Sequence, residues 1–404
     1  MEMRENNKRN IYLLAWTSLL NDMSSEMIMP ILPMFLQSLG AGPVVISLLG
    51  GLRDGLGNIL KMLFGHISDK TGRRKVFIVG GYLFSSVCKL FLAISRSWPF
   101  AMVFALLERV GKGMRNAPRD ALIAESMPKH EGFGFGLHRM MDTIGAILGS
   151  LLVLLLYWGL QLKFNLLILI AAIIGFLTLI PLVWVKEYRR DPVARSLVFD
   201  LKVLPGKMKL FLGIAFLYSL GELSYMLFIS RAEYMAFGRY KILAPLAFYV
   251  AFNVLYAAFS VPFGLLLDRI GGRRAVSIGY ALMTLTLFGF AFFRPMWGFV
   301  LFGLYGISKA ALQGNQTAYV GRMASDEIKG TAIGTFQTLA GIAMILGNLI
   351  AGLIWKAFGL RWAFIYAGTM TGLALIFMFV FWRKMDELEK KQERSSIWLN
   401  KRLR

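Results

Sequence analysis

Two copies of one short motif constrain the fold of this chain more than any other feature. The first copy reads GHISDKTGRRK over residues 65–75, and the second reads GLLLDRIGGRR over residues 264–274. In each copy an aspartate follows a glycine by four residues, a turn with two arginines comes next, and apolar runs flank the whole motif. The duplication predicts two homologous halves, each with a short basic loop between two apolar helices.

The apolar runs have the length and composition of transmembrane helices. The chain is 57% hydrophobic and 17% charged, with a mean hydropathy of +0.59, whereas a soluble domain needs more charge to cover its surface. Runs of about twenty apolar residues span a bilayer as helices, and none alternates polarity as barrel strands do. We therefore expect an all-α integral membrane protein with twelve spans, at 11–38, 45–65, 75–95, 98–124, 132–157, 163–185, 210–235, 243–266, 274–293, 296–321, 330–356 and 362–383.

The basic residues concentrate on one side of the predicted membrane. A net charge of +22 could indicate a nucleic-acid partner. Most of the excess, however, lies in alternate loops, around 65–75, 186–209 and 269–274, and in the tail. Short cytoplasmic loops of membrane proteins carry such an excess of Lys and Arg. We therefore expect a plasma-membrane location with both termini in the cytoplasm, and no nucleic-acid partner.

One long connection divides the chain. Residues 186–209 are rich in bases and contain two prolines that follow or precede turn-forming residues. The expected organisation is an N-terminal six-helix bundle (1–185), a cytoplasmic linker (186–209), a C-terminal six-helix bundle (210–383) and a basic cytoplasmic tail (384–404). The tail either lies on the inner leaflet as a basic amphipathic segment or is solvated.

Several classes of function lack support in the sequence. The single cysteine, Cys88, stands inside an apolar run, so neither a disulfide framework nor a Cys/His metal cluster is possible. The glycine-rich strings at 111–113 and 132–136 lack the context of a nucleotide-binding loop. The first apolar run contains Asp22 and Glu26 and no cleavage site, so it is a span rather than a signal peptide. We expect no metal, no cofactor and no enzymatic activity.

Charged residues inside the spans are the candidates for function, because a charge within a bilayer costs about 2.5–3.5 kcal/mol on insertion scales. Most of them lie in the first half. Asp22 and Glu26 share one face of the first span, and Arg109, Lys112, Asn116 and Arg119 share one face of the fourth. A basic stripe of this kind requires carboxylates or an anionic ligand opposite it. The predicted coupling residues are Asp22, Glu26, Asp54, Arg109, Lys112 and Asp142.

Two charged or titratable residues of the spans leave alternatives open. Arg109 serves either in coupling or in a static lattice of salt bridges between helices. His138, four residues before Asp142, fits either a proton relay or a packing role.

The doubled loop, together with Arg109-x-x-Lys112-Gly113 in the fourth span, resembles the major facilitator superfamily. The strings NDMSSEM (21–27) and APRDALIA (117–124) are similar to a bacterial and archaeal permease or drug-exporter subfamily. The resemblance implies a monomer that works by alternating access, with the loop acid Asp69 pairing across the halves near a helix N-terminus. It implies a gate made of Gly65, Asp69, Gly72, Arg73, Arg74, Asp268 and Arg273. One departure is Ser150 after Gly149, where exporters of this superfamily often carry proline.

The expected function is secondary active transport of a small organic solute, coupled to protons and directed outward. A proton- or gradient-driven organic-anion importer is the alternative, and a non-transporting membrane sensor is a remote one. The expected partners are the solute, protons and membrane lipid. The predicted substrate cavity contains Arg53, Lys89, Glu222 and Lys309. Since Lys89 and Lys309 have no acid nearby in their own spans, we expect an unpaired lysine on each wall of the cavity.

Overall fold

The structure is a computed structural model that describes residues 2–126, 131–187, 204–236, 238, 240–292, 297–325 and 328–381. Within its helices, the side chains of 2–8, 58, 61, 62, 69, 125, 131–133 and 235 lie outside this description, as do most of the predicted linker and the whole predicted tail. The helices are α1 (Glu2–Ile28), α2 (Leu32–Ser38), α3 (Pro43–Thr71), α4 (Arg74–Ala93), α5 (Trp98–Ser126), α6 (Glu131–Leu160), α7 (Phe164–Leu177), α8 (Leu179–Val183), α9 (Gly206–Leu220), α10 (Tyr225–Met235), α11 (Tyr240–Ile270), α12 (Gly272–Phe292), α13 (Gly298–Leu312), α14 (Asn315–Met323), α15 (Lys329–Phe358) and α16 (Leu360–Val380).

These helices account for all twelve expected spans. Eight spans are single helices, and four are two helices end to end: α1 with α2, α7 with α8, α9 with α10, and α13 with α14. Pro33 lies in the first turn of α2, where its missing N–H costs nothing. Gly314, with a φ of 90°, separates α13 from α14. The described part of the chain contains no strand, so the predicted all-α membrane fold is confirmed.

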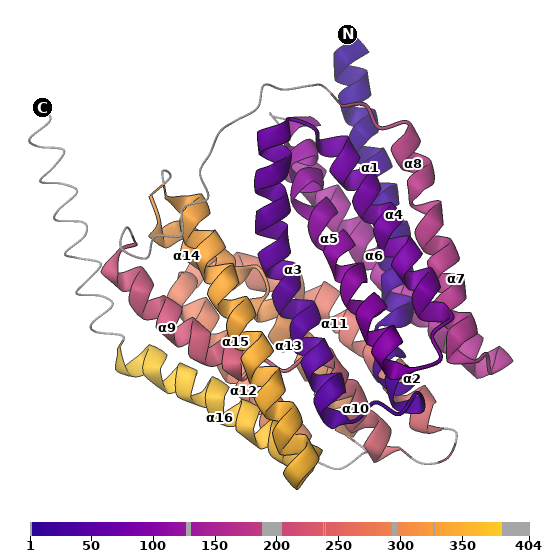
Figure 1. Ribbon diagram of the computed structural model, residues 1–404. Coiled ribbons are helices and arrows are strands. Elements are labelled where there is room, and N and C mark those ends of the chain that lie inside the picture. The colour runs from indigo at the N-terminus through magenta and orange to yellow at the C-terminus, as the bar shows by residue number, and fades with distance from the viewer. Residues whose placement is uncertain are drawn as a thin grey trace, which may run out of the picture.

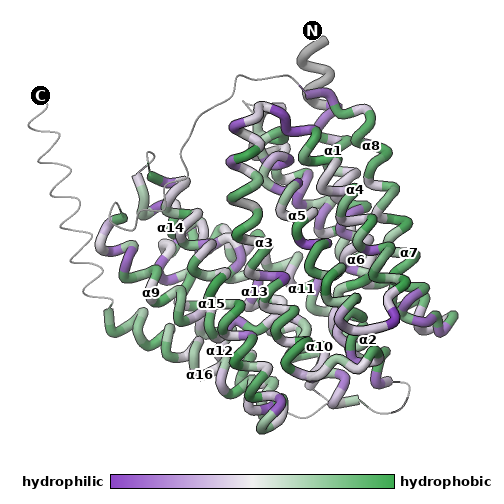
Figure 2. Tube along the Cα trace, in the orientation of Figure 1, coloured by the Kyte–Doolittle hydropathy of each residue, from purple (hydrophilic) through white to green (hydrophobic). Residues whose placement is uncertain are grey.

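Within the part of the chain that the structure describes, eight of the spans are long and apolar enough to cross a membrane on length and composition alone. The other four are α1 with α2, α3, α5, and α13 with α14, which carry many of the charged and amide side chains predicted to be functional. Figure 2 shows the contrast between α7 and α8, which are hydrophobic along most of their length, and α5, which carries hydrophilic stretches. The polar spans therefore need an interior position, and the apolar spans can face lipid.

The helices form two halves, shown in indigo to magenta and in rose to yellow in Figure 1. Equivalent glycines pack equivalent helices in each half. Gly149 of α6 lies against the main-chain carbonyl of Met23 in α1, and Gly347 of α15 lies against that of Leu220 in α9. A side chain at either glycine would collide with the neighbouring backbone, as expected where small residues let membrane helices approach closely. The internal repeat predicted from the sequence is thus present in the packing.

The halves touch at one end and separate at the other. Along α3 and α15, contacts run from Gly352 against Val44 to Gly55, where a Cβ atom would lie 2.5 Å from the Gly341 carbonyl oxygen. Beyond this point a Cβ atom at Gly57 would meet no atom of another helix within 4 Å. Figure 1 shows the same divergence of α3 and α15 toward the end of the molecule where α3 meets α4. We call this end the basic side, after its motif loops at 65–75 and 264–274, and the other end the sealed side.

Candidate substrate cavity

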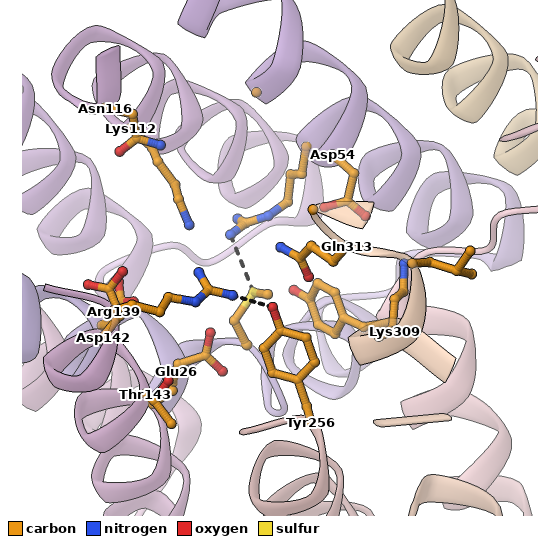
Figure 3. A pocket seen from close by; sticks show the side chains of 18 of the residues that line it. Glu26, Asp54, Lys112, Asn116, Arg139, Asp142, Thr143, Tyr256, Lys309 and Gln313 are labelled. Atoms are coloured by element: carbon orange, nitrogen blue, oxygen red, sulfur yellow. Dashed lines mark hydrogen bonds between the residues drawn. The ribbon is translucent and has the colours of Figure 1, made fainter. Parts of the chain in front are cut away.

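A cavity of about 840 Å³ lies between the two halves and widens toward the basic side. Among the described residues, six carboxylates and six Lys or Arg side chains line it, and of these only Glu222 and Lys309 come from the second half. The second half contributes a wall of aromatic rings instead: Tyr225, Tyr249, Phe252, Tyr256 and Tyr305. The sequence-based expectation of a charged first half and a more apolar second half is confirmed for this cavity (Figure 3).

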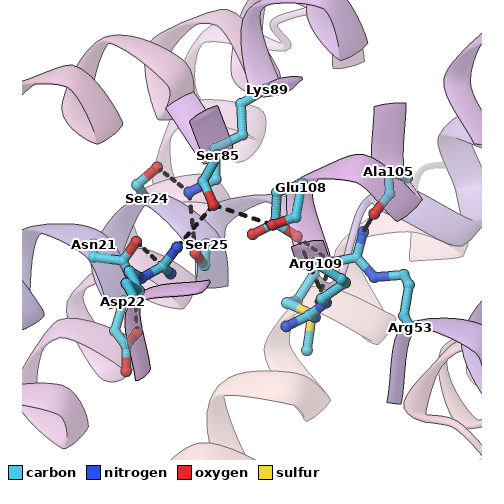
Figure 4. A network of polar contacts seen from close by, with 12 residues as sticks. Asn21, Asp22, Ser24, Ser25, Arg53, Ser85, Lys89, Ala105, Glu108 and Arg109 are labelled. Carbon is cyan, nitrogen blue, oxygen red and sulfur yellow. Dashed lines mark hydrogen bonds and ion pairs between the residues drawn. The ribbon is translucent and has the colours of Figure 1, made fainter. Parts of the chain in front are cut away.

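Helix α1 presents its two acids to the cavity, as their spacing predicts. Asp22 and Glu26 both line the cavity together with Asn21, whereas Met23, Ser24 and Ser25 between the two acids do not. Asn21 accepts a hydrogen bond from Arg115 at 2.9 Å and donates one to Asp22 at 2.9 Å (Figure 4). Because Arg115 is fully buried, this chain of contacts fixes the orientation of the Asp22 carboxylate.

Glu26 connects the two halves. Its carboxylate accepts a hydrogen bond from the Tyr249 hydroxyl of α11 at 2.7 Å and a longer one from Asn253 at 3.5 Å. No described Lys or Arg side chain forms an ion pair with it. An ionised Glu26 would therefore depend on these neutral donors and on water in the open cavity.

The basic stripe on α5 faces the cavity, as its spacing predicts. Arg109, Lys112, Asn116 and Arg119 all line the wall. Arg109 lies 3.5 Å from the buried Glu108 carboxylate. The same carboxylate also pairs with Arg53 at 3.2 Å, so one acid serves two arginines (Figure 4).

The prediction of an unpaired lysine on each wall of the cavity is wrong. Lys309 forms an ion pair with Glu222 at 2.6 Å, because the break between α9 and α10 brings that acid beside it. Lys89 is 1% exposed and does not line the cavity. Its ammonium group donates to Ser24 at 2.8 Å and to Ser25 at 3.0 Å, on the side of α1 that faces away from the cavity (Figure 4).

Two opposite charges on the wall remain without a partner. Lys112 of α5 and Asp54 of α3 are not within hydrogen-bonding or ion-pairing distance of any other side chain that the structure describes. Figure 3 shows both side chains directed into the central space from different helices. The unpaired lysine is therefore Lys112, which the sequence reasoning had assigned to coupling.

The remaining predicted coupling residue, Asp142, is engaged within the first half. It accepts a hydrogen bond from Ser18 and lies 3.4 Å from His138, which also lines the cavity. The sequence did not predict Arg139 as part of the site. Arg139 donates to the Tyr256 hydroxyl of α11, which links α6 with the other half (Figure 3). The sequence does not indicate this contact, because Tyr256 is one of many tyrosines in apolar runs.

The turns of the doubled motif are present. Gly72, with a φ of 63°, directly follows α3, and Gly271, with a φ of 84°, directly follows α11; this backbone conformation favours glycine. After the first turn, the Glu187 carboxylate accepts hydrogen bonds from the backbone N–H groups of Arg74 and Lys75, which caps the start of α4.

The gate assignment itself stays a prediction. The Asp69 side chain lies outside the described residues, so its pairing across the halves is not observed. Its counterpart Asp268 forms an ion pair with Arg322 of α14, within the second half. Gly65 lies against Ala117 of α5, and Arg73 precedes α4 in an extended conformation.

Truncating Lys309 should test its role as an ion-pair partner. We expect Lys309→Gln to lower the melting temperature, because it leaves Glu222 uncompensated. Breaking a fully buried pair costs about 3–5 kcal/mol, and water in the cavity should reduce that cost here, since both side chains are about one-fifth exposed. The double variant Lys309→Gln/Glu222→Gln should recover most of the loss in a thermal melt in detergent. A double variant less stable than the single one would contradict the pairing.

No group of three or more His, Cys, Asp or Glu side chains that could hold a metal ion occurs among the residues that the structure describes. A helical membrane protein whose halves enclose a solute-sized cavity, open at one end and sealed at the other, has the architecture of a transporter. Comparisons with known proteins agree with this class.

The chain matches the sequence profile of the Major Facilitator Superfamily over residues 14–252 and again over 211–403. It is 48% identical over 379 residues to an "Uncharacterized MFS-type transporter" of Methanocaldococcus jannaschii, covering 92% of this chain and 95% of that one. It is 26% identical to the multidrug resistance protein MdtG of Enterobacter lignolyticus, covering 93% of this chain and 91% of that one. Its fold is similar to that of a mutant of the nucleoside transporter NupG, with a TM-score of 0.76 at 14% identity, covering 92% and 99% of the two chains.

The chain therefore belongs to the major facilitator superfamily and is a multi-pass membrane transporter, as the resemblance in its motifs predicted. Members of this superfamily bind small-molecule substrates and are typically monomeric.

Proposed function

We propose that this transporter exports a small organic solute in exchange for protons. In this proposal the basic side faces the cytoplasm, as the excess of Lys and Arg in its loops favours, with both termini inside and the plasma membrane as the location. The structure would then represent the inward-open state. The similarity to MdtG, whose name describes it as a multidrug resistance protein, supports the outward direction.

The contact between Glu26 and Tyr249 carries the proposal. It places a carboxylate without a described basic partner at the junction of the halves. In the open cavity water solvates its charge, but closing the cavity removes that water, and an unpaired charge inside a bilayer is costly. The cavity should therefore close only when a proton or a cationic group of the solute neutralises Glu26. A proton entering from outside and a solute entering from the cytoplasm would then alternate at one site.

The other wall acids support the same scheme. Asp22 accepts a hydrogen bond from the neutral amide of Asn21, and Asp142 accepts one from Ser18 and lies near His138. Asp54 pairs with no polar side chain that the structure describes. Together with Arg109, these acids would form a proton-sensitive network around Glu26. In this scheme Asp69 and the neighbouring motif residues would close the basic side when the cavity opens outward.

Everted membrane vesicles provide a test. The vesicles are acidified inside, and the collapse of the pH gradient is followed by fluorescence while norfloxacin, ethidium or p-toluate is added outside. Proton-coupled export predicts a collapse with at least one of these probes for the wild type and none for Glu26→Gln. The absence of a difference between the two proteins with every probe would contradict the proposal.

A proton-coupled importer of organic anions is the second candidate, and the unpartnered Lys112 favours it. It predicts instead a collapse of the gradient with p-toluate loaded inside the vesicles, since anion and proton would leave the lumen together.

A further inference from the structure

Most of the charged side chains that line the cavity have a partner, and the two described exceptions carry opposite charges. Arg53 and Arg109 share Glu108, Arg119 lies 3.0 Å from Asp120, and Lys309 pairs with Glu222. The remaining wall acids and bases other than Lys112 and Asp54 have hydrogen-bond partners, as described above. Among the described residues, Lys112 and Asp54 are thus the two charged wall side chains with no such contact.

Charges within a membrane protein are normally compensated, and uncompensated ones mark sites that a ligand or ion occupies. Lys112 presents three N–H donors and no acceptor, whereas an ionised Asp54 presents acceptors only. A ligand that satisfies both needs a negative group for Lys112 and a positive group for Asp54. A lipophilic cation would leave Lys112 unpaired when the cavity closes, and a simple anion would leave Asp54 unpaired.

The rest of the wall sets the character of the ligand body. Tyr225, Tyr249, Phe252, Tyr256 and Tyr305 of the second half line the same cavity, as does Phe336. Phe252 stacks between Tyr249 and Tyr305 with ring centroids 5.5 and 4.7 Å apart. Such a surface accommodates an aromatic or apolar body, and a cavity of about 840 Å³ lies within the usual range for drug-sized molecules.

We propose that the substrates are amphipathic zwitterions: compounds with an aromatic or apolar body whose anionic group binds Lys112 and whose cationic group binds Asp54. This inference gives the substrate class for the proposed export function and rests on it. In this arrangement the solute itself supplies the counter-charges of Lys112 and Asp54. Binding is measured at equilibrium without a pH gradient, so the result does not depend on whether transport is coupled to protons.

Two matched sets of probes test the proposal. The first contains 4-(aminomethyl)benzoate, p-toluate and 4-methylbenzylamine, which share one ring and differ only in charge. The second contains norfloxacin, its N-acetyl derivative and its decarboxylated derivative, with a larger body and more widely separated charges. Binding of each probe to the purified protein is measured by calorimetry at one neutral pH, for the wild type, Lys112→Gln and Asp54→Asn. Lys163→Gln, an exposed lysine at the start of α7, is the control.

The proposal predicts a crossed pattern. In at least one set, the zwitterion should bind the wild type about tenfold or more tightly than either singly charged analogue, which corresponds to about 1.4 kcal/mol or more. Lys112→Gln should weaken binding of the zwitterion and of the anion but not of the cation. Asp54→Asn should weaken binding of the zwitterion and of the cation but not of the anion. Lys163→Gln should leave all affinities unchanged.

Three results would overturn the proposal. One is a singly charged analogue that binds as tightly as its zwitterion in both sets. Another is a variant in which binding of all three probes of a set is weakened alike. That result would mean that Lys112 and Asp54 maintain the conformation of the protein rather than bind the charged groups of the ligand. The third is no binding of either zwitterion up to its solubility limit.

Discussion

Glu26→Gln is expected to abolish transport driven by a pH gradient while leaving solute exchange intact. Glutamine is neutral at every pH, so the cavity can close around it without taking up a proton. The Tyr249 hydroxyl, now 2.7 Å from a carboxylate oxygen, can still donate to the amide oxygen of glutamine, so the contact between the halves should survive. In proteoliposomes, gradient-driven flux should fall to the level of empty liposomes, and counterflow of labelled substrate should continue.

Glu233→Gln is the matched control, because Glu233 is also largely buried but lies outside the cavity and pairs with Lys241 at 3.5 Å. It should retain gradient-driven flux. Amide substitutions at Asp22 and Asp54 show whether the rest of the network contributes. If Glu26→Gln, Asp22→Asn and Asp54→Asn all kept wild-type gradient-driven flux, proton coupling through this network would be wrong.

Gly55→Leu is expected to open the sealed side. A side chain at Gly55 would meet the main-chain carbonyl of Gly341 and the Ile345 side chain, where α3 and α15 are in closest contact. Overpacking of this kind costs about 1–3 kcal/mol, enough to move a two-state equilibrium about 5- to 150-fold. The inward-open state should lose population to states in which α3 and α15 separate at this end, and transport should slow.

Spin-label distances measure this shift. One pair of labels, at Ser38 and Tyr234, reports on the sealed side, and another, at Thr71 and Gly330, reports on the basic side. All four positions are exposed at helix ends, and the buried Cys88 is replaced by serine. Gly55→Leu should lengthen the first distance, whereas the control Gly57→Ala, with open space around it, should not. Identical distances in both variants would exclude the Gly55 contact as part of the seal.

The sequence was sufficient to predict the fold because its signals are local and repeated. The apolar runs, the doubled motif and the glycines around Gly149 and Gly347 each report on one helix or one turn. The faces of α1 and α5 were predictable for the same reason, since helical spacing alone places Asp22 beside Glu26 and Arg109 beside Lys112.

The pairing of charges across helices was not predictable, because it depends on helix breaks and rotations. Nothing local to Lys309 shows that Glu222 lies beside it, since the acid is supplied by the break between α9 and α10. Likewise, the packing of α4 against α1 directs Lys89 to Ser24 and Ser25, away from the cavity, and nothing local to Lys89 in the sequence shows this. The domain boundaries near the linker stay predictions, because most of that segment lies outside the described residues.

The central claim is that protonation of the wall carboxylates, Glu26 above all, controls which side of the cavity is open. The most direct test follows the same two label pairs in wild-type protein in lipid nanodiscs at alkaline and at acidic pH. We predict a long basic-side distance and a short sealed-side distance at alkaline pH, with the two reversing in part of the population at acidic pH. Glu26→Gln should show the acidic pattern at both pH values. Distances that do not change with pH in the wild type, and do not change on Glu26→Gln, would contradict the account.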